Sequence, residues 1–214
     1  MLNIIKNSKK LAGTSYNRSP NNQDAVGQSK IISGIPTANN KCVVQFGIYN
    51  NLYWNGNSTI RAANNCYSYA VNIKRFSGNK YNFPHPGFCH IGRKPKKDQE
   101  LIDGVKADGL IPLGESINCP QGNKDNPVWL VALYTGILTT DSPEGEEWDY
   151  HFYRKVWTGN GSDKFYWGHK PGSEAVTHVD VSTDYPHEDA KRLGYTNFIG
   201  AYLVPNITIC GLSY

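Results

Sequence analysis

Two aromatic-rich runs joined by an Asn-Gly pair constrain the fold of this chain most. Residues 150–157 and 165–170 flank a polar segment that contains Asn160 and Gly161. Aromatic residues favour strands, and Asn-Gly is typical of a type I′ turn because both residues tolerate a positive φ. The sequence therefore predicts an antiparallel hairpin, and with it a sheet in this part of the chain.

The register of this hairpin decides which side chains meet. If Asn160 and Gly161 are the central turn residues, His151 faces Lys170 and lies beside His169. A one-residue bulge or a longer loop would place the two histidines directly opposite each other. In either register they lie close together, and a second histidine can orient the ring of the first.

A cysteine well before the hairpin has the setting of a nucleophile. Cys66 follows Asn64 and Asn65, and asparagine is common as a helix N-cap. The apolar residues that follow predict a helix over residues 64–75. A helix N-terminus stabilises the thiolate, which is the form of cysteine that attacks. The two asparagines are expected to cap this helix or to donate hydrogen bonds to an oxyanion. The simpler interpretation of Cys66 is a small core residue.

The hairpin supplies the partners of this cysteine. His151 is the predicted general base, because a histidine on a later strand can take the thiol proton. His169 is the first candidate to orient it, and Asp180 is the rival. Asp149 shares the strand face of His151 and can tune its charge, although an ordinary exposed carboxylate is the simpler interpretation. Cys66, His151 and His169 are thus the predicted catalytic residues, with Asn65 and Asp180 as binding residues.

Three blocks of sequence carry a family resemblance. NNCYSYAVN, DYHFYR and WGHKPG resemble bacterial and viral proteins with NCYxYAxN, DYHxYR and WxHKPG motifs. That family resembles a divergent branch of papain-like cysteine peptidases of the NlpC type, and the likeness spans about residues 60–204. The resemblance implies a papain-like α+β fold in which a capped N-terminal helix packs on an antiparallel sheet. It implies the same roles for Cys66, His151 and His169.

Composition divides the chain near residue 42. Residues 6–41 contain few large apolar side chains, so residues 1–41 are expected to form an irregular N-terminal arm. Residues 42–214 are expected to form one α+β domain. Within it we expect strands in segments 42–54, 128–138, 150–157, 165–170 and 198–204, and a second helix over residues 96–107.

The cysteines bear on compartment and metal binding. There are five of them, an odd number without close regular spacing, so a reducing compartment is the simpler expectation. His85, Cys89, His90 and Cys119 form an alternative zinc site, but they include no Cys-x-x-Cys pair. The predicted hydrolytic site needs neither a metal nor a cofactor.

Charge and hydropathy limit the partners and the location. The net charge of +4 is too small to predict nucleic-acid binding. The sequence contains no apolar run long enough for a membrane span. Its start lacks the apolar core of a secretory leader, so the expected location is the cytoplasm of the producing cell or a virion.

Two functions follow from the sequence. The first is a cysteine peptidase or amidase that acts on a peptide or a peptidoglycan-like substrate. The second is a virion-associated structural protein, such as a minor capsid or tail component, that binds other virion proteins and keeps the fold without the chemistry.

Overall fold

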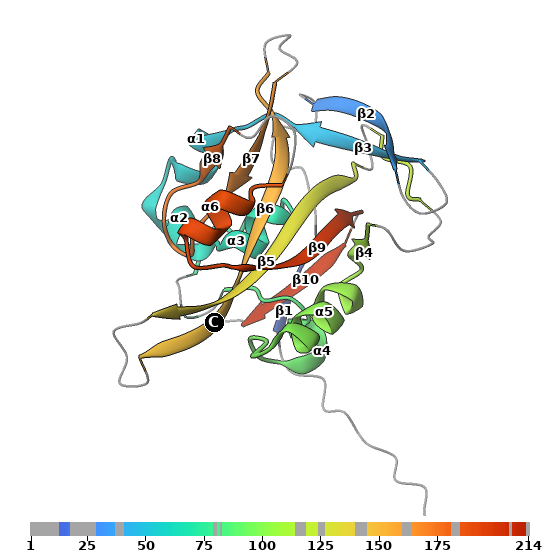
Figure 1. Ribbon diagram of the computed structural model, residues 1–214. Helices are drawn as coiled ribbons and strands as arrows, with labels where there is room; N and C mark the ends of the chain where they lie inside the picture. Colours follow the sequence, from blue (N-terminus) through green and yellow to red (C-terminus); the bar gives the residue numbers. More distant parts are fainter. Residues whose placement is uncertain are drawn as a thin grey trace, which may run out of the picture.

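A six-stranded antiparallel sheet forms the centre of the molecule (Figure 1). The structure is a computed structural model and describes residues 13–17, 29–36, 41–78, 81, 83–113, 119–123, 127–139, 145–159, 164–180, 185–205 and 207–212. Across the sheet the strands are β4 (Ile111–Pro112), β9 (Asn197–Val204), β5 (Trp129–Thr139), β6 (Glu146–Trp157), β7 (Phe165–His169) and β8 (Thr177–Val179).

Two smaller sheets involve the N-terminal part of the chain. Strand β1 (Gly13–Asn17) pairs with β10 (Thr208–Leu212), and β2 (Ser29–Pro36) pairs with β3 (Lys41–Gly47). The prediction of an irregular arm over residues 1–41 is therefore wrong for β1 and β2. Composition misleads here because backbone hydrogen bonds to a partner strand can hold a strand that has few large apolar side chains. The rest of the arm lies outside the described residues.

The helices are short, and this corrects the predicted fold class. Only α5 (Asp98–Ala107) exceeds six residues among the described helices. The others are α1 (Asn51–Asn55), α2 (Ser58–Ala63), α3 (Cys66–Ala70), α4 (Phe88–Ile91) and α6 (His187–Arg192). The described fold is mostly antiparallel sheet with a few short helices, so the prediction of a papain-like α+β fold is wrong, although the capped helix α3 does pack on the sheet.

The helix predicted over residues 64–75 shows why the structure contains less helix than predicted. It ends at Ala70, because Asn72 adopts a positive φ of 56° and the Ile73 N–H donates to the Ser68 carbonyl instead of continuing the helix. Asparagine tolerates this left-handed conformation better than most residues. A single turn of helix therefore remains around Cys66.

The central sheet is buried on both faces, which explains the nearly unbroken apolar run in β5. One face, with Leu133 and Phe152, packs against α3 and α5. The opposite face, with Tyr134 and Tyr153, packs against β3 and α6. These two cores hold β6 rigidly at the middle of the molecule. Such a strand is a suitable platform for a site that needs fixed geometry.

Several predicted elements are confirmed by the structure. The segments 128–138, 150–157 and 165–170 correspond to β5, β6 and β7, and residues 96–107 contain α5. Strand β9 confirms the strand predicted over residues 198–204, and it sits between β4 and β5. Both edges of β9 are thus paired, one with β4 and the other with β5, and the chain then continues into β10 of a separate sheet.

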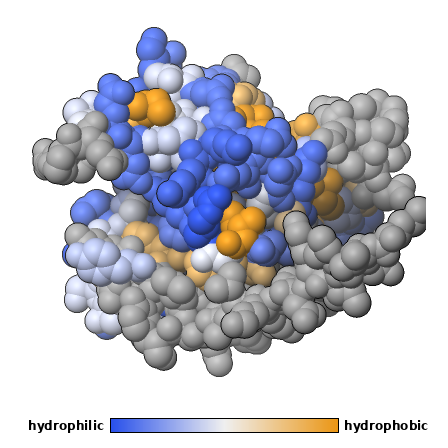
Figure 2. Space-filling model, turned by 90° about the horizontal axis from the view of Figure 1, so that it is seen from below, coloured by the Kyte–Doolittle hydropathy of each residue, from blue (hydrophilic) through white to orange (hydrophobic). Residues whose placement is uncertain are grey.

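On the face seen from below, the described residues are largely hydrophilic, with separate apolar spots among them (Figure 2). The large apolar side chains most exposed among the described residues are Leu52, Tyr81, Ile137, Phe76, Ile91 and Phe198. In the described part of the chain, the helices are too short and too polar to cross a membrane.

Candidate functional site

The first residues of α3 are held by an asparagine cap. Asn65 is extended, and its Oδ1 accepts hydrogen bonds from Ser68 N at 3.0 Å and Ser68 Oγ at 3.1 Å. Its Nδ2 donates to the carbonyl of Pro84 at 2.9 Å. Asn64 does not cap α3; its Nδ2 donates to the carbonyls of Ile60 and Arg75, and its Oδ1 accepts from the Arg75 N–H. The capping role is confirmed for Asn65, and both asparagines hold Cys66 in place.

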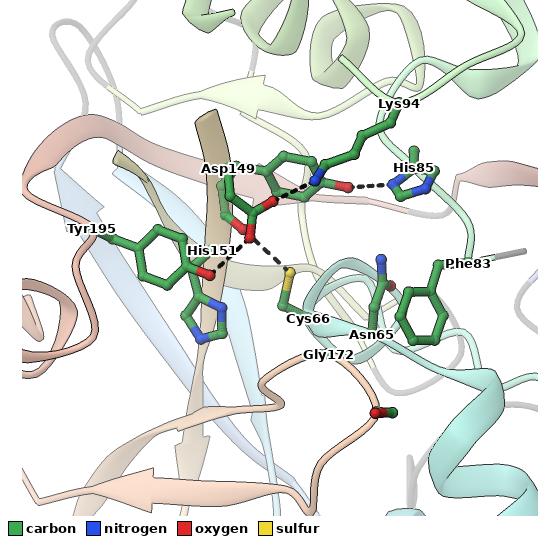
Figure 3. A pocket seen from close by; sticks show the side chains of 11 residues that line it. Asn65, Cys66, Phe83, His85, Lys94, Asp149, His151, Gly172 and Tyr195 are labelled. Carbon is green, nitrogen blue, oxygen red and sulfur yellow. Dashed lines mark hydrogen bonds and ion pairs between the residues drawn. The ribbon is translucent and has the colours of Figure 1, made fainter. Parts of the chain in front are cut away.

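Cys66 lies against the edge of β6 that faces away from β5, which we call the outer edge of β6. Its Sγ is 3.9 Å from the carbonyl oxygen of Tyr150, and the Phe152 N–H points toward the sulfur. The sulfur thus lies beside the backbone of the residue between them, His151. It has no direct hydrogen bond to the His151 ring in the structure, although both groups line one pocket (Figure 3).

The environment keeps this sulfur protonated. Burial, together with the carboxylate of Asp149, raises the pKa of the Cys66 thiol to about 12. The N–H groups of Phe152 and Tyr67 and the ammonium of Lys94 act in the opposite direction and lower this pKa less than burial raises it. The resting site therefore holds a neutral thiol at neutral pH. A nucleophile of this kind needs a base that takes its proton as it attacks.

The hairpin brings the two predicted histidines together. Strands β6 and β7 are antiparallel, as predicted, but Tyr153 faces His169, so neither of the two predicted registers is correct. The histidines are diagonal neighbours on one face of the sheet, and His151 Nε2 lies 2.8 Å from His169 Nδ1. The turn residues Asn160 and Gly161 lie outside the described residues.

An aspartate extends the pair of histidines into a relay. Asp189 Oδ2, at the start of α6, lies 3.6 Å from His169 Nε2 and accepts from the Tyr153 hydroxyl at 2.8 Å. A carboxylate favours an N–H on the nitrogen that faces it, so His169 carries its proton on Nε2 and accepts at Nδ1. The His151 Nε2–H then donates to His169, which leaves the lone pair of His151 Nδ1 as the basic position.

Burial keeps both rings neutral. It lowers the pKa of His151 well below the usual range, with a further decrease from the neighbouring His169. It also lowers the pKa of His169 to about 4, although the Asp189 carboxylate acts in the opposite direction. At neutral pH, His151 is therefore an unprotonated imidazole that is able to accept a proton.

A pocket of about 390 Å³ surrounds the thiol and the base. The ring of Tyr195 stacks on His151 with the centroids 4.9 Å apart, and its hydroxyl donates to Asp149 at 2.9 Å. Lys94 forms an ion pair with Asp149 at 2.9 Å on the same side (Figure 3). His85 lies next to Lys94 in Figure 3, and its Nδ1 is 2.7 Å from the Tyr150 hydroxyl. Asp149 is thus part of the pocket and not an ordinary exposed carboxylate.

The three sequence blocks meet behind this pocket. Arg154 of β6 faces Gly168 of β7, and the guanidinium lies 4.3 Å from the ring centroid of Tyr69 in α3. A Cβ at Gly168 would come within 2.2 Å of the Tyr69 hydroxyl, so only glycine allows the ring this close to β7. These contacts fix α3, and with it Cys66, against the hairpin.

The remaining predicted residues lie apart from the site or have other roles. Asp180 is exposed after β8 and bonds neither histidine, so Asp189 takes the orienting position. Lys170 is buried and donates to the Gly172 carbonyl at 2.7 Å, which anchors the loop that lines the pocket. The alternative zinc site is wrong, because Cys89 is disulfide-bonded and Cys119 is bridged to Cys42.

Sequence reasoning missed four residues of the site. Asp189, Tyr195 and Lys94 belong to segments without a recognisable motif, and His85 was considered only as a zinc ligand. The one available signal is the FPHPG string around His85, whose two prolines and glycine indicate a fixed loop.

Comparison with known proteins finds one type of relative. Insoluble matrix shell protein 1 from Ruditapes philippinarum is 31% identical over 145 residues, which cover 66% of this chain and 79% of the relative. No protein-family model matches the chain. No solved structure matches it.

Proposed function

We propose that this chain, which belongs to the same family as insoluble matrix shell protein 1, is a cysteine hydrolase that cleaves an amide or ester bond. The observation that supports this proposal is the relay from Asp189 through His169 to His151, which ends in the pocket that Cys66 lines. A purely structural core has no need for two neutral, mutually oriented imidazoles beside a buried thiol.

The proposed reaction proceeds through a thioester. As the Cys66 sulfur attacks the substrate carbonyl, the thiol turns from Tyr150 O toward His151, and Nδ1 takes its proton. The imidazolium then gives this proton to the leaving amine or alcohol, and the acyl group stays on sulfur. Water attacks the thioester, His151 takes a proton from the water, and the acid leaves as the proton returns to sulfur. His169 and Asp189 hold the base and stabilise its charged form.

The test is the capture of the acyl-enzyme with p-nitrophenyl acetate. The wild type should release a burst of one p-nitrophenol per chain and gain one acetyl group at Cys66, identified by peptide mass spectrometry. Cys66→Ala should give neither signal. A wild type that behaves like Cys66→Ala would eliminate the proposal.

A structural role is the second candidate. It is favoured by the relative, which is named as an insoluble shell matrix protein. In this case the chain would be a component of an insoluble shell matrix, and Cys66 would be a packing residue. The role in a virion stays a prediction. Insolubility of the native protein together with an inert Cys66 would support the matrix role, whereas acylation of Cys66 would favour the hydrolase.

The disulfide between Cys42 and Cys119 bears on the compartment. It joins β3 to a segment 77 residues away, and Cys89 is disulfide-bonded as well. Disulfides form and persist in oxidising environments, so we propose that the protein works there and not in a reducing cytoplasm. Free-thiol counting on freshly isolated protein tests this, since a reducing location would leave these cysteines open to alkylation.

A further inference from the structure

The outer edge of β6 is unpaired next to the thiol. Strand β7 pairs with β6 only from Tyr153 onward, so no described strand pairs with the stretch from Glu146 to Phe152 on this edge. Strand β5 covers the opposite edge along the same stretch. The β5–β6 pair projects beyond the rest of the sheet, at the lower left of Figure 1.

The contacts of Cys66 show which backbone groups face outward. The carbonyl of Tyr150 and the N–H of Phe152 point toward the sulfur, so they lie on the unpaired edge. Groups two residues apart share an edge in a regular strand. The N–H and carbonyl of Trp148 therefore also point outward, roughly 7 Å along the strand from those of Tyr150.

Space for a ligand lies along this edge. A hollow of about 350 Å³ separates β6 from the loop at Lys94 and Pro95, and Glu146, Glu147 and Trp148 form its floor. It adjoins the thiol pocket at Lys94, which lines both. A third hollow, of about 500 Å³, begins at Trp148 and contains Ile137, which is 56% exposed. The second hollow thus shares Lys94 with the thiol pocket and Trp148 with the third hollow, so the three are neighbours.

We propose that the substrate is a polypeptide that binds in extended form as an added strand on the outer edge of β6. This inference rests on the proposed hydrolase function. The backbone of the substrate exchanges hydrogen bonds with the N–H and carbonyl of Trp148. This pairing places the next peptide bond of the substrate at Cys66. A folded segment does not fit, because an added strand must offer its own free backbone groups.

The two faces of β6 give this strand a side-chain preference. Side chains of an added strand alternate between the faces. On one face they meet Trp148, whose cross-strand partner Ile137 on β5 extends the apolar surface, so this face accepts an apolar side chain. On the other face they meet the ion-paired Glu147, Asp149 and Lys94, which suit a polar side chain.

Amide hydrogen exchange tests this binding mode without catalysis. The protein is the full chain carrying Cys66→Ala, and the probe is reduced and carboxymethylated α-lactalbumin, which is an unfolded polypeptide. The probe should bind and slow exchange of the Trp148 amide at least tenfold. The Glu147 amide faces β5 and should not change, and native α-lactalbumin should not bind.

Two substitutions in the same Cys66→Ala background separate backbone from side-chain binding. Trp148→Ala keeps the outward N–H, whereas Trp148→Pro removes it without removing a bond to β5. Probe affinity should be about three- to tenfold weaker for Trp148→Pro than for Trp148→Ala, as expected for one hydrogen bond. If thermal unfolding shows that Trp148→Pro is not folded, the hydrogen-exchange experiment alone decides whether the substrate binds as an added strand.

The outcomes separate this inference from the proposed function. Probe binding without protection of Trp148, equal affinities of the two folded variants, or binding of chitin hexasaccharide but not of the polypeptide would overturn it. If the wild type forms no acyl-enzyme but the edge still binds the probe, the hydrolase proposal fails and strand addition stands. If acylation occurs and the probe does not bind, strand addition alone fails.

Discussion

His151 Nε2 and His169 Nδ1 lie 2.8 Å apart across two neighbouring strands, and this contact leaves Nδ1 of His151 as the basic nitrogen of the pocket. The ring that takes the proton is thus oriented from behind by a second ring, which in turn faces Asp189. Loss of any member should affect catalysis in a graded way.

The relay predicts that His169→Ala lowers the acylation rate by about 10²- to 10⁴-fold, because His151 loses its tautomer and its orientation. Asp189→Asn should have a smaller effect, since the carboxylate acts one step further away. Burst kinetics with p-nitrophenyl acetate measure both. The exposed His90 provides the matched control, because His90→Ala should leave the rate unchanged. A purely structural His169 would lower the thermal midpoint and leave the acylation rate of the folded fraction intact.

Labelling of Cys66 should depend steeply on pH. With the pKa of the thiol raised to about 12, the thiolate fraction grows about tenfold per pH unit from pH 7 to pH 10, and alkylation by iodoacetamide should grow with it. Peptide mass spectrometry at fixed times gives the rate. A rate that is already maximal near pH 6 would reveal a resting thiolate–imidazolium pair and would contradict the neutral site.

Acid should destabilise the fold through the buried histidines. Burial lowers the pKa of His85 and of His169 to about 4, from 6.5. Below pH 6.5 these rings bind protons in the unfolded chain but stay unprotonated in the folded one. The free energy of unfolding that they contribute is therefore fully present above pH 6.5 and falls toward pH 4. Each ring contributes at most about 1.4 kcal/mol per pH unit. The thermal midpoint should drop over this interval, and His85→Gln should make the drop shallower. An unchanged slope in His85→Gln would remove His85 from this account.

Gly168→Ala should damage both stability and activity. Its Cβ would lie 2.2 Å from the Tyr69 hydroxyl, so α3 must move away from the hairpin or Tyr69 must leave its place under Arg154. Overpacking of this kind costs about 1 to 3 kcal/mol. Urea unfolding measures the loss, and the double variant with Tyr69→Phe, which removes the hydroxyl, should recover part of it. No recovery would place the strain elsewhere.

The local chemistry of the sequence predicts much of the site. The Asn-Gly turn, the aromatic runs and the asparagine cap each act over a few residues, so the hairpin and the cap of α3 could be predicted, and with them the His151–His169 contact. The length of α3 could not be predicted, because the left-handed conformation of Asn72 ends this helix.

The rest of the site depends on tertiary packing. Asp189 reaches His169 only because α6 packs on the face of the sheet that carries Tyr153, and no spacing in the sequence encodes this. The same holds for Tyr195 and Lys94, which arrive from separate loops. The two N-terminal strands were missed because pairing with β3 and β10 compensates for their polar composition.

Chemical rescue of the base tests the central claim most directly. His151→Gly removes the ring that lines the pocket together with Cys66, and it leaves space there for free imidazole. We expect this variant to lose acylation by p-nitrophenyl acetate and to regain it in proportion to added imidazole, with no regain when Cys66→Ala is combined with it. A His151→Gly variant that acylates Cys66 at the wild-type rate without imidazole would contradict the claim that His151 activates the thiol.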